Sequence, residues 1–300
     1  MTHTKDVRST NRTVRTPRQV WRGRWVGATV AAGLPALSGL LVALAMPRGP
    51  VTALQALAVM SANLIVGVVS GLALRSPWAM VLAPVAYGLV FEIGRVGASG
   101  PLVDAPRFDT TYGILALILG RGVHALLAFL PMVLGILYGL TLARQLSLAG
   151  ASDGPLYARY VAIALLTLVT VGLAVLIALP ASTPPITGPD GEPVPGSIAT
   201  LEKVRLGGHD QWISIRGRST DNPVLLYLSG GPGQSDLPYS RVLFEDLTDD
   251  FIVVGWDQRG TGKSHPALDP VAELTLEQAI ADTAELSENL TNTYEELSLV

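Results

Sequence analysis

Residues 222–235 read NPVLLYLSGGPGQS, and residues 251–264 read FIVVGWDQRGTGKS. Each stretch opens with a continuous apolar run, 223–228 in the first and 251–256 in the second. Such runs suit short strands that are buried on both faces of a mostly parallel sheet. Each run leads into a segment with several glycines, which favours a tight turn after the strand. The two stretches therefore predict an α/β sheet.

The residues around these stretches supply the other elements of such a domain. Residues 201–206 and 211–216 alternate in polarity around two adjacent glycines, which predicts a β-hairpin. Residues 239–247 and 276–294 are candidate helices, and Thr275 with Gln278 is a candidate capping box for the second. Residues 297–300 predict the start of a further strand. The order β-β-β-α-β-α over residues 200–300 indicates an α/β domain.

The first part of the chain has a different composition. The chain as a whole is 49% hydrophobic and 15% charged, which is too apolar for an ordinary soluble protein. Residues 1–24 carry 7 Lys/Arg and one acid, and residues 25–181 carry 7 Arg and 4 acids. Residues 182–300 carry 7 Lys/Arg and 19 acids, a formal charge of −12. This distribution predicts a basic tail, a membrane region of helices and an acidic domain.

Five segments are candidate transmembrane helices, each of which needs about 20 mainly apolar residues. They are residues 25–46, 52–74, 78–94, 123–143 and 160–179. Residues 112–119 are apolar but short, and they form either an interfacial segment or an N-terminal extension of the fourth span. The number of spans is therefore five or six. The first segment is too long for the apolar core of a signal peptide and is expected to be retained.

The basic tail predicts the orientation of these spans, because positively charged flanks stay on the cytoplasmic side. We expect a cytoplasmic N-terminus, the lipid bilayer of the cell membrane as a partner, and residues 200–300 outside the cytoplasm. An even number of spans would reverse the placement of residues 200–300. The proline-rich residues 182–199 predict a semi-rigid linker of polyproline II type between the two parts.

Some small and polar residues lie inside the spans. The Gly-x-x-x-Gly patterns at residues 67–71 and 135–139 allow helix backbones to approach closely, and packing within the chain is the favoured interpretation. The notable polar residues are Asn63, Glu92 and Arg95. Because Glu92 and Arg95 are three residues apart near the end of a span, a structural pair is favoured over a transport site.

The glycine-rich residues 229–233 suit the hydrolysis of an amide or ester. In that reaction the carbonyl oxygen becomes negatively charged in the transition state, and backbone N–H groups aimed at it stabilise the charge. Glycines allow the backbone to come close to the substrate. Taken alone, residues 229–233 fit an ordinary Gly-Pro turn equally well.

Taken together, the two stretches resemble the proline iminopeptidase family, a branch of the α/β-hydrolases. Its members carry His-Gly-Gly-Pro-Gly after the third strand and Asp-Gln-Arg-Gly-x-Gly-x-Ser after the fourth. The chain has both runs in this order, except that Ser229 stands at the usual histidine position. The resemblance covers residues 200–300, the N-terminal half of a hydrolase domain.

This resemblance implies roles for five residues. Gly230 and Gly231 would belong to the oxyanion loop. Asp257, Arg259 and Gly260 would belong to a structural turn, in which the favoured role of Arg259 is to order nearby loops and a contact with the substrate is the alternative. The implied activity is that of a serine aminopeptidase, with a peptide or a small amide or ester as substrate.

The second glycine segment also approaches a phosphate-binding loop, G-x-x-x-x-G-K-[ST]. Asp257 replaces the first glycine of that motif, and its carboxylate would repel a phosphate. Pro266 disfavours helical geometry at His265, whereas a phosphate-binding loop leads directly into a helix. Nucleotide binding is therefore not expected.

A serine hydrolase of this fold carries its nucleophile in Gly-x-Ser-x-Gly after the fifth strand, followed by the triad acid and histidine. The 300 residues contain no such pattern, and the last histidine, His265, precedes the fifth strand. We expect the nucleophile to follow Val300 in a longer protein, and the 300 residues alone to be inactive.

Two alternatives stay open. One is a membrane protein whose hydrolase-like part only binds a partner or small molecule, and the other is an esterase on the same scaffold. The chain has no cysteine and four scattered histidines, so no metal site is expected. We also expect no cofactor and no nucleic-acid partner.

Overall fold

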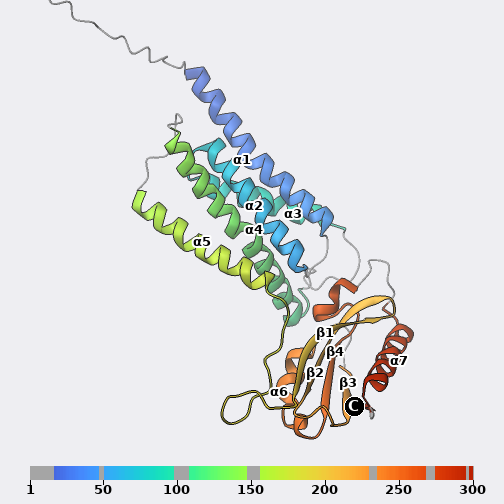
Figure 1. Ribbon diagram of the computed structural model, residues 1–300. Helices are drawn as coiled ribbons and strands as arrows, with labels where there is room; N and C mark the ends of the chain where they lie inside the picture. Colours follow the sequence, from blue (N-terminus) through green and yellow to red (C-terminus); the bar gives the residue numbers. More distant parts are fainter. Residues whose placement is uncertain are drawn as a thin grey trace, which may run out of the picture. The chain divides into compact units, whose positions relative to one another are not determined.

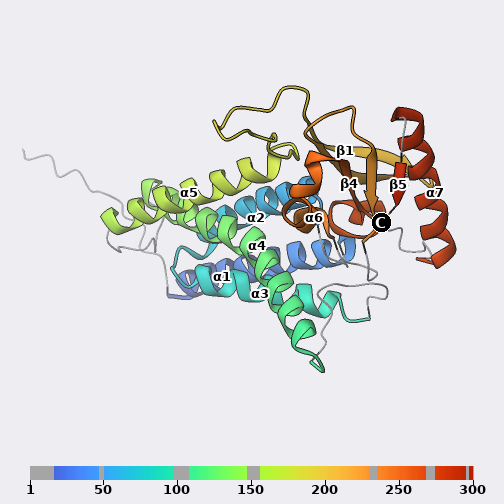
Figure 2. The same cartoon turned by 90° about the horizontal axis from the view of Figure 1, so that it is seen from below.

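The computed structural model describes residues 17–46, 51–97, 108–146, 156–229, 235–267, 274–294 and 297–299. Its contacts divide the chain into two units, Met1–Ala178 and Leu179–Val300. The first unit is helical, and the second contains a sheet with helices (Figures 1 and 2). Each unit is described by itself.

The helical unit contains α1 (Pro17–Ala45), α2 (Ala53–Leu74), α3 (Ala79–Gly94), α4 (Thr111–Gln145) and α5 (Leu156–Ala178). Four of these, α1, α2, α4 and α5, are long and apolar enough to cross a membrane. The 16 residues of α3 extend only about 24 Å, less than the ~30 Å hydrocarbon core of a bilayer. Residues 112–119 continue into the fourth predicted span as part of α4, so the structure supports the N-terminal extension.

Two glycine pairs hold α2 against α4. A Cβ added to Gly67 would lie 2.1 Å from the Met132 carbonyl oxygen, and one added to Gly135 would lie 2.1 Å from the Leu64 carbonyl oxygen. Gly71 and Gly139 meet the facing backbone in the same way, at 2.4 and 2.3 Å. The Gly-x-x-x-Gly patterns therefore mediate packing within the chain, as predicted.

The interior of the helical unit contains a polar cluster to which four helices contribute. Ser38 of α1 donates to Asn63 of α2 at 3.4 Å, and Asn63 is completely buried. The hydroxyl of Tyr87 on α3 hydrogen-bonds to the Asn63 side chain and lies 3.0 Å from Nε2 of His124 on α4. The His124 ring also stacks on Phe91 with 4.1 Å between the centroids. These contacts satisfy polar groups that a bilayer would leave unpaired.

Glu92 forms an ion pair with Arg121 of α4, with 2.6 Å between Oε1 and Nε. Arg95 has its guanidinium 5.1 Å from the Phe91 ring centroid, and its pairing with Glu92 stays a prediction. Sequence spacing could not identify Arg121, because the pairing depends on the packing of α3 against α4.

The sheet unit contains five strands in the order β1-β2-β4-β3-β5. They are β1 (Ile198–Leu206), β2 (His209–Gly217), β3 (Val224–Tyr227), β4 (Ile252–Asp257) and β5 (Leu297–Leu299). The hairpin and the three later strands lie where the sequence predicts them. Figures 1 and 2 show α6 (Leu237–Leu243) and α7 (Leu276–Thr293) on opposite faces of the sheet.

The sheet is mixed, which corrects the prediction of a mostly parallel one. Strand β3 is parallel to β4 and to β5, whereas β2 is antiparallel to both β1 and β4. The antiparallel pairing of β1 with β2 follows from the turn of the hairpin, where Gly207 and Gly208 have φ of +54° and +79°. Two such residues form the tight turn that reverses the chain.

Buried apolar side chains from β2, β3 and β4 join Leu286 and Leu290 of α7 in the core of this unit. Thr275 caps α7 by accepting from the Gln278 N–H at 3.2 Å, which confirms this half of the predicted capping box. The predicted helix over residues 239–247 is wrong about where the helix ends. Helix α6 stops at Leu243, and a short 3-10 helix (Asp246–Asp249) follows.

The proline-rich segment is partly folded onto the sheet unit. Arg216 of β2 donates to Thr183 Oγ1 at 3.0 Å and to the Pro184 carbonyl at 2.7 Å. Thr187 and Pro193 form an isolated β-bridge. A freely extended spacer would not make these contacts. The role of residues 182–199 as a linker stays a prediction.

Candidate functional site

The candidate site lies where β3 and β4 end. These strands are parallel neighbours, so the segments that follow them leave the same edge of the sheet. A pocket of about 450 Å³ opens there, within the range of small-molecule sites. Its lining combines apolar and polar side chains of the two segments and of α7: Ser229, Trp256, Gln258, Arg259, Gly260, Thr261, Leu274, Thr275, Leu276, Gln278, Ala279 and Asp282.

The residues on both sides of the predicted oxyanion loop, which follows β3, are held by hydrogen bonds. Gly230 and Gly231 themselves lie outside the described residues. The Ser229 hydroxyl donates to Asp236, and the Ser229 carbonyl accepts from Gln258 Nε2 at 3.2 Å. Since Asp236 is almost fully buried just before α6, its contact with Ser229 ties the two ends of the loop together.

The segment after β4 is a tight turn organised by Asp257. This carboxylate is 1% exposed and accepts from the Ser235 hydroxyl at 2.6 Å and from the Lys263 N–H at 2.7 Å. Burial raises the pKa of Asp257, and the bonds from Ser235 and Lys263 offset part of the rise. Asp257 therefore connects the two segments that follow β3 and β4.

Two glycines make room in this turn. Gly260 has φ of +80°, a conformation that favours glycine. Gly262 has φ of +41°, and a Cβ there would lie 2.3 Å from Asp257 Oδ2. The turn is closed by a bond from the Gly260 N–H to the Ser264 carbonyl at 3.2 Å.

Arg259 points from this turn into a buried polar network. Its Nε and Nη2 donate to the two carboxylate oxygens of Asp282 at 3.2 and 3.0 Å, and Nη2 also donates to the Gly207 carbonyl at 3.2 Å. Asp282 accepts two further bonds, from Gln278 at 2.7 Å and from Gln211 at 2.8 Å. The hairpin, the turn and α7 thus meet at one carboxylate.

Asp257 is the last residue of β4, and Arg259 and Gly260 lie in the turn that follows it. Arg259 and Gly260 line the pocket. The functional roles assigned to these residues stay predictions. Sequence reasoning missed Asp282. Its signal was present, because Asp282 precedes Leu286 and Leu290 at helical spacing and so lies on the face of α7 that turns to the core.

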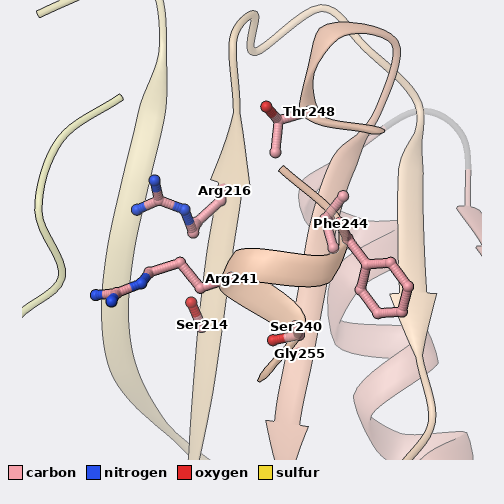
Figure 3. A pocket seen from close by; sticks show the side chains of 8 residues that line it. Ser214, Arg216, Ser240, Arg241, Phe244, Thr248 and Gly255 are labelled. Atoms are coloured by element: carbon pink, nitrogen blue, oxygen red, sulfur yellow. The ribbon is translucent and has the colours of Figure 1, made fainter. Parts of the chain in front are cut away.

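A second, much smaller pocket lies between β2, β4 and α6 (Figure 3). Figure 3 shows the side chains of Arg216 and Arg241 reaching in the same direction, while the Phe244 ring turns away. The volume is about 10 Å³, close to the minimum for a single water molecule. The larger pocket is therefore the candidate for a substrate.

Comparisons with known proteins agree with a hydrolase-like relationship for part of the chain. No family model matches. The chain is 36% identical over 92 residues to the "Probable aminopeptidase YbaC" of Bacillus subtilis (strain 168). The match covers 31% of this chain and 29% of that protein, so the chain spans less than a third of its relative's length.

Among solved structures, the chain is similar to the proline iminopeptidase-related protein TTHA1809 from Thermus thermophilus. The identity is 28%, the coverage is 34% of this chain and 35% of that chain, and the TM-score is 0.29. The sequence match to the aminopeptidase supports a relationship to the α/β-hydrolases at low coverage.

Proposed function

We propose that the chain is part of a membrane-anchored α/β-hydrolase of aminopeptidase type. The observation that carries this proposal is that Ser229, directly after β3, and residues 258–261, directly after the parallel β4, line one pocket. In open α/β sheets, ligands bind outside the carboxyl ends of the strands. The similarity to a probable aminopeptidase supports amide hydrolysis as the reaction.

In this proposal the 300 residues supply the binding half of the site. Backbone N–H groups of the segment with Gly230 and Gly231 stabilise the oxyanion, while Asp257 and Arg259 fix the segments around it. The sequence holds no Gly-x-Ser-x-Gly elbow. The nucleophile and its base come from outside these residues, and the 300 residues alone are inactive.

The reaction is tested on the gene product isolated from its own membranes. It should hydrolyse N-terminal proline arylamides and react with a fluorophosphonate probe, whereas purified residues 1–300 should do neither. Turnover and labelling by residues 1–300 would disprove their inactivity. Absence of both from the native product would favour a non-catalytic binding protein, and faster cleavage of esters than of amides would favour an esterase.

Anchoring rests on the four helices that are long and apolar enough to span a bilayer. We propose that α3 also inserts, that the N-terminus is cytoplasmic and that the sheet unit lies outside. Because the chain has no cysteine, a single introduced cysteine is a unique reporter. In intact cells an impermeant maleimide should label Thr220→Cys but not Ser9→Cys. The reverse pattern would place the sheet unit inside, and release of the chain by alkaline carbonate would disprove anchoring.

A further inference from the structure

A basic pocket lies on the strongly acidic sheet unit, at the end of the β1–β2 hairpin. Its volume is about 250 Å³. The lining residues are Lys203, Arg205, Gly208, His209, Asp210, Trp212 and Lys263. Three of the seven Lys/Arg residues of residues 182–300 gather here, although acids outnumber bases in that part of the chain by 19 to 7.

Lysine is rare in the chain, and its placement in this pocket is specific. The chain has three lysines, Lys5, Lys203 and Lys263. The last two are 60 positions apart, yet their ammonium groups lie 5.5 and 5.6 Å from the centroid of one indole ring, that of Trp212. An indole beside two cations favours a ligand that has both a charged group and an adjoining apolar part.

The backbone holds these side chains in place. Lys203 is paired with Trp212 across the hairpin, and Arg205 lies two residues further on the same face of β1. The Trp212 N–H donates to the fully buried Ser264 hydroxyl at 2.8 Å, which brings the neighbouring Lys263 to the hairpin. The pocket is therefore built from two segments that the fold joins.

The positive charge of the pocket is only partly balanced. Asp210 is the one carboxylate among its lining residues, and it lies 3.7 Å from Lys203 and 3.5 Å from Arg205. Each of these side chains is more than half exposed, so both ion pairs are weak. The positive side chains of the lining outnumber the carboxylate, and an anion can replace solvent at the pocket.

We propose that this pocket binds the phosphate group of an anionic phospholipid headgroup. The inference rests on the proposed membrane attachment, because a tethered domain meets headgroups at a high effective concentration. Lysine and arginine side chains near an anionic surface attract it, and tryptophan prefers the boundary between water and lipid. The remaining surface of the acidic unit is repelled by such lipids, so the pocket orients the unit on the membrane.

The test uses the full chain in a neutral maltoside detergent and the soluble lipid dihexanoyl phosphatidylglycerol. Acetylation of Lys203 and Lys263 is followed by mass spectrometry during a lipid titration. Phosphatidylglycerol should protect both lysines, and dihexanoyl phosphatidylcholine should not. Arg205→Gln should raise the protecting concentration about fivefold, as expected for one charge. Arg241→Gln, which removes a charge elsewhere on the same unit, should leave it unchanged.

Equal protection by both lipids, or equal effects of Arg205→Gln and Arg241→Gln, would overturn the proposal. Inorganic phosphate that protects as well as phosphatidylglycerol would assign the pocket to a soluble anion instead. The short-chain lipid is soluble, so this result does not depend on whether the helices span a bilayer. Failure of the anchoring proposal, seen by carbonate extraction, is thereby distinguished from failure at this pocket.

Discussion

Arg259 and Asp282 form a buried ion pair with two hydrogen bonds, from Nε to Oδ2 at 3.2 Å and from Nη2 to Oδ1 at 3.0 Å. The side chains are 9% and 1% exposed. The pair joins the turn after β4 to α7, and both residues line the candidate site. The position of this wall of the pocket therefore depends on the pair.

Loss of the Asp282 carboxylate should strongly destabilise the sheet unit. Asp282→Ala leaves the Arg259 guanidinium buried without its partner, and we expect a loss of about 3–5 kcal/mol in the free energy of unfolding. Asp249→Ala is the control, because Asp249 pairs with Arg218 while 62% exposed, and should cost at most ~1 kcal/mol. Urea titration of the full chain in detergent, read by pulse proteolysis, measures both. Equal losses would show that the Arg259 pair is not structural.

The glycine contacts between α2 and α4 predict a sharp effect of a single methyl group. Gly135→Ala places a Cβ 2.1 Å from the Leu64 carbonyl oxygen, and the helices must separate. We expect a loss of about 1–3 kcal/mol, as for other overpacked sites. Gly172→Ala is the matched control in α5, where a Cβ would meet nothing within 4 Å. Thermal unfolding in detergent should separate the two variants, and coincident melting curves would contradict the close packing.

Much of this fold follows from local patterns in the sequence. The apolar runs at residues 223–228 and 251–256 predicted buried strands, and the paired glycines of the hairpin predicted a tight turn. The sequence did not predict that β2 would pair with β4 in the antiparallel direction, because this pairing depends on which strand edges meet after the chain has folded. Arg259 was recognised from its motif. Its partner Asp282 was not, since their pairing requires α7 to pack against the sheet.

Ser264 should protect the backbone amide of Trp212 from hydrogen exchange. Its hydroxyl is fully buried and accepts the Trp212 N–H at 2.8 Å, so Ser264→Ala leaves a buried donor unpaired. The expected cost is about 1–3 kcal/mol, with faster hydrogen exchange at the Trp212 amide. Ser219→Ala removes an exposed acceptor of the Asp221 N–H and serves as the control. Unchanged exchange at Trp212 in the Ser264 variant would rule out this hydrogen bond.

His265 should make the stability of the sheet unit depend on pH. Burial lowers the pKa of His265 below its usual value of about 6.5, and the hydrogen bond with the Gly262 carbonyl offsets part of this shift. The unfolded chain therefore binds a proton more readily than the folded one. The stabilising contribution is complete above about pH 6.5 and is lost as the pH falls through the lower, folded-state pKa.

His265→Gln removes this titration while keeping a polar side chain of similar reach. Between pH 7 and pH 5, the free energy of unfolding of the wild-type chain should fall more steeply than that of the variant. Other titrating groups, among them Asp257 with its raised pKa, are common to both proteins and cancel in the difference. Urea titrations at half-unit steps of pH measure the two slopes. Parallel curves would mean that His265 titrates equally in the folded and unfolded states, and a steeper fall in the variant would reverse the assigned direction of the shift.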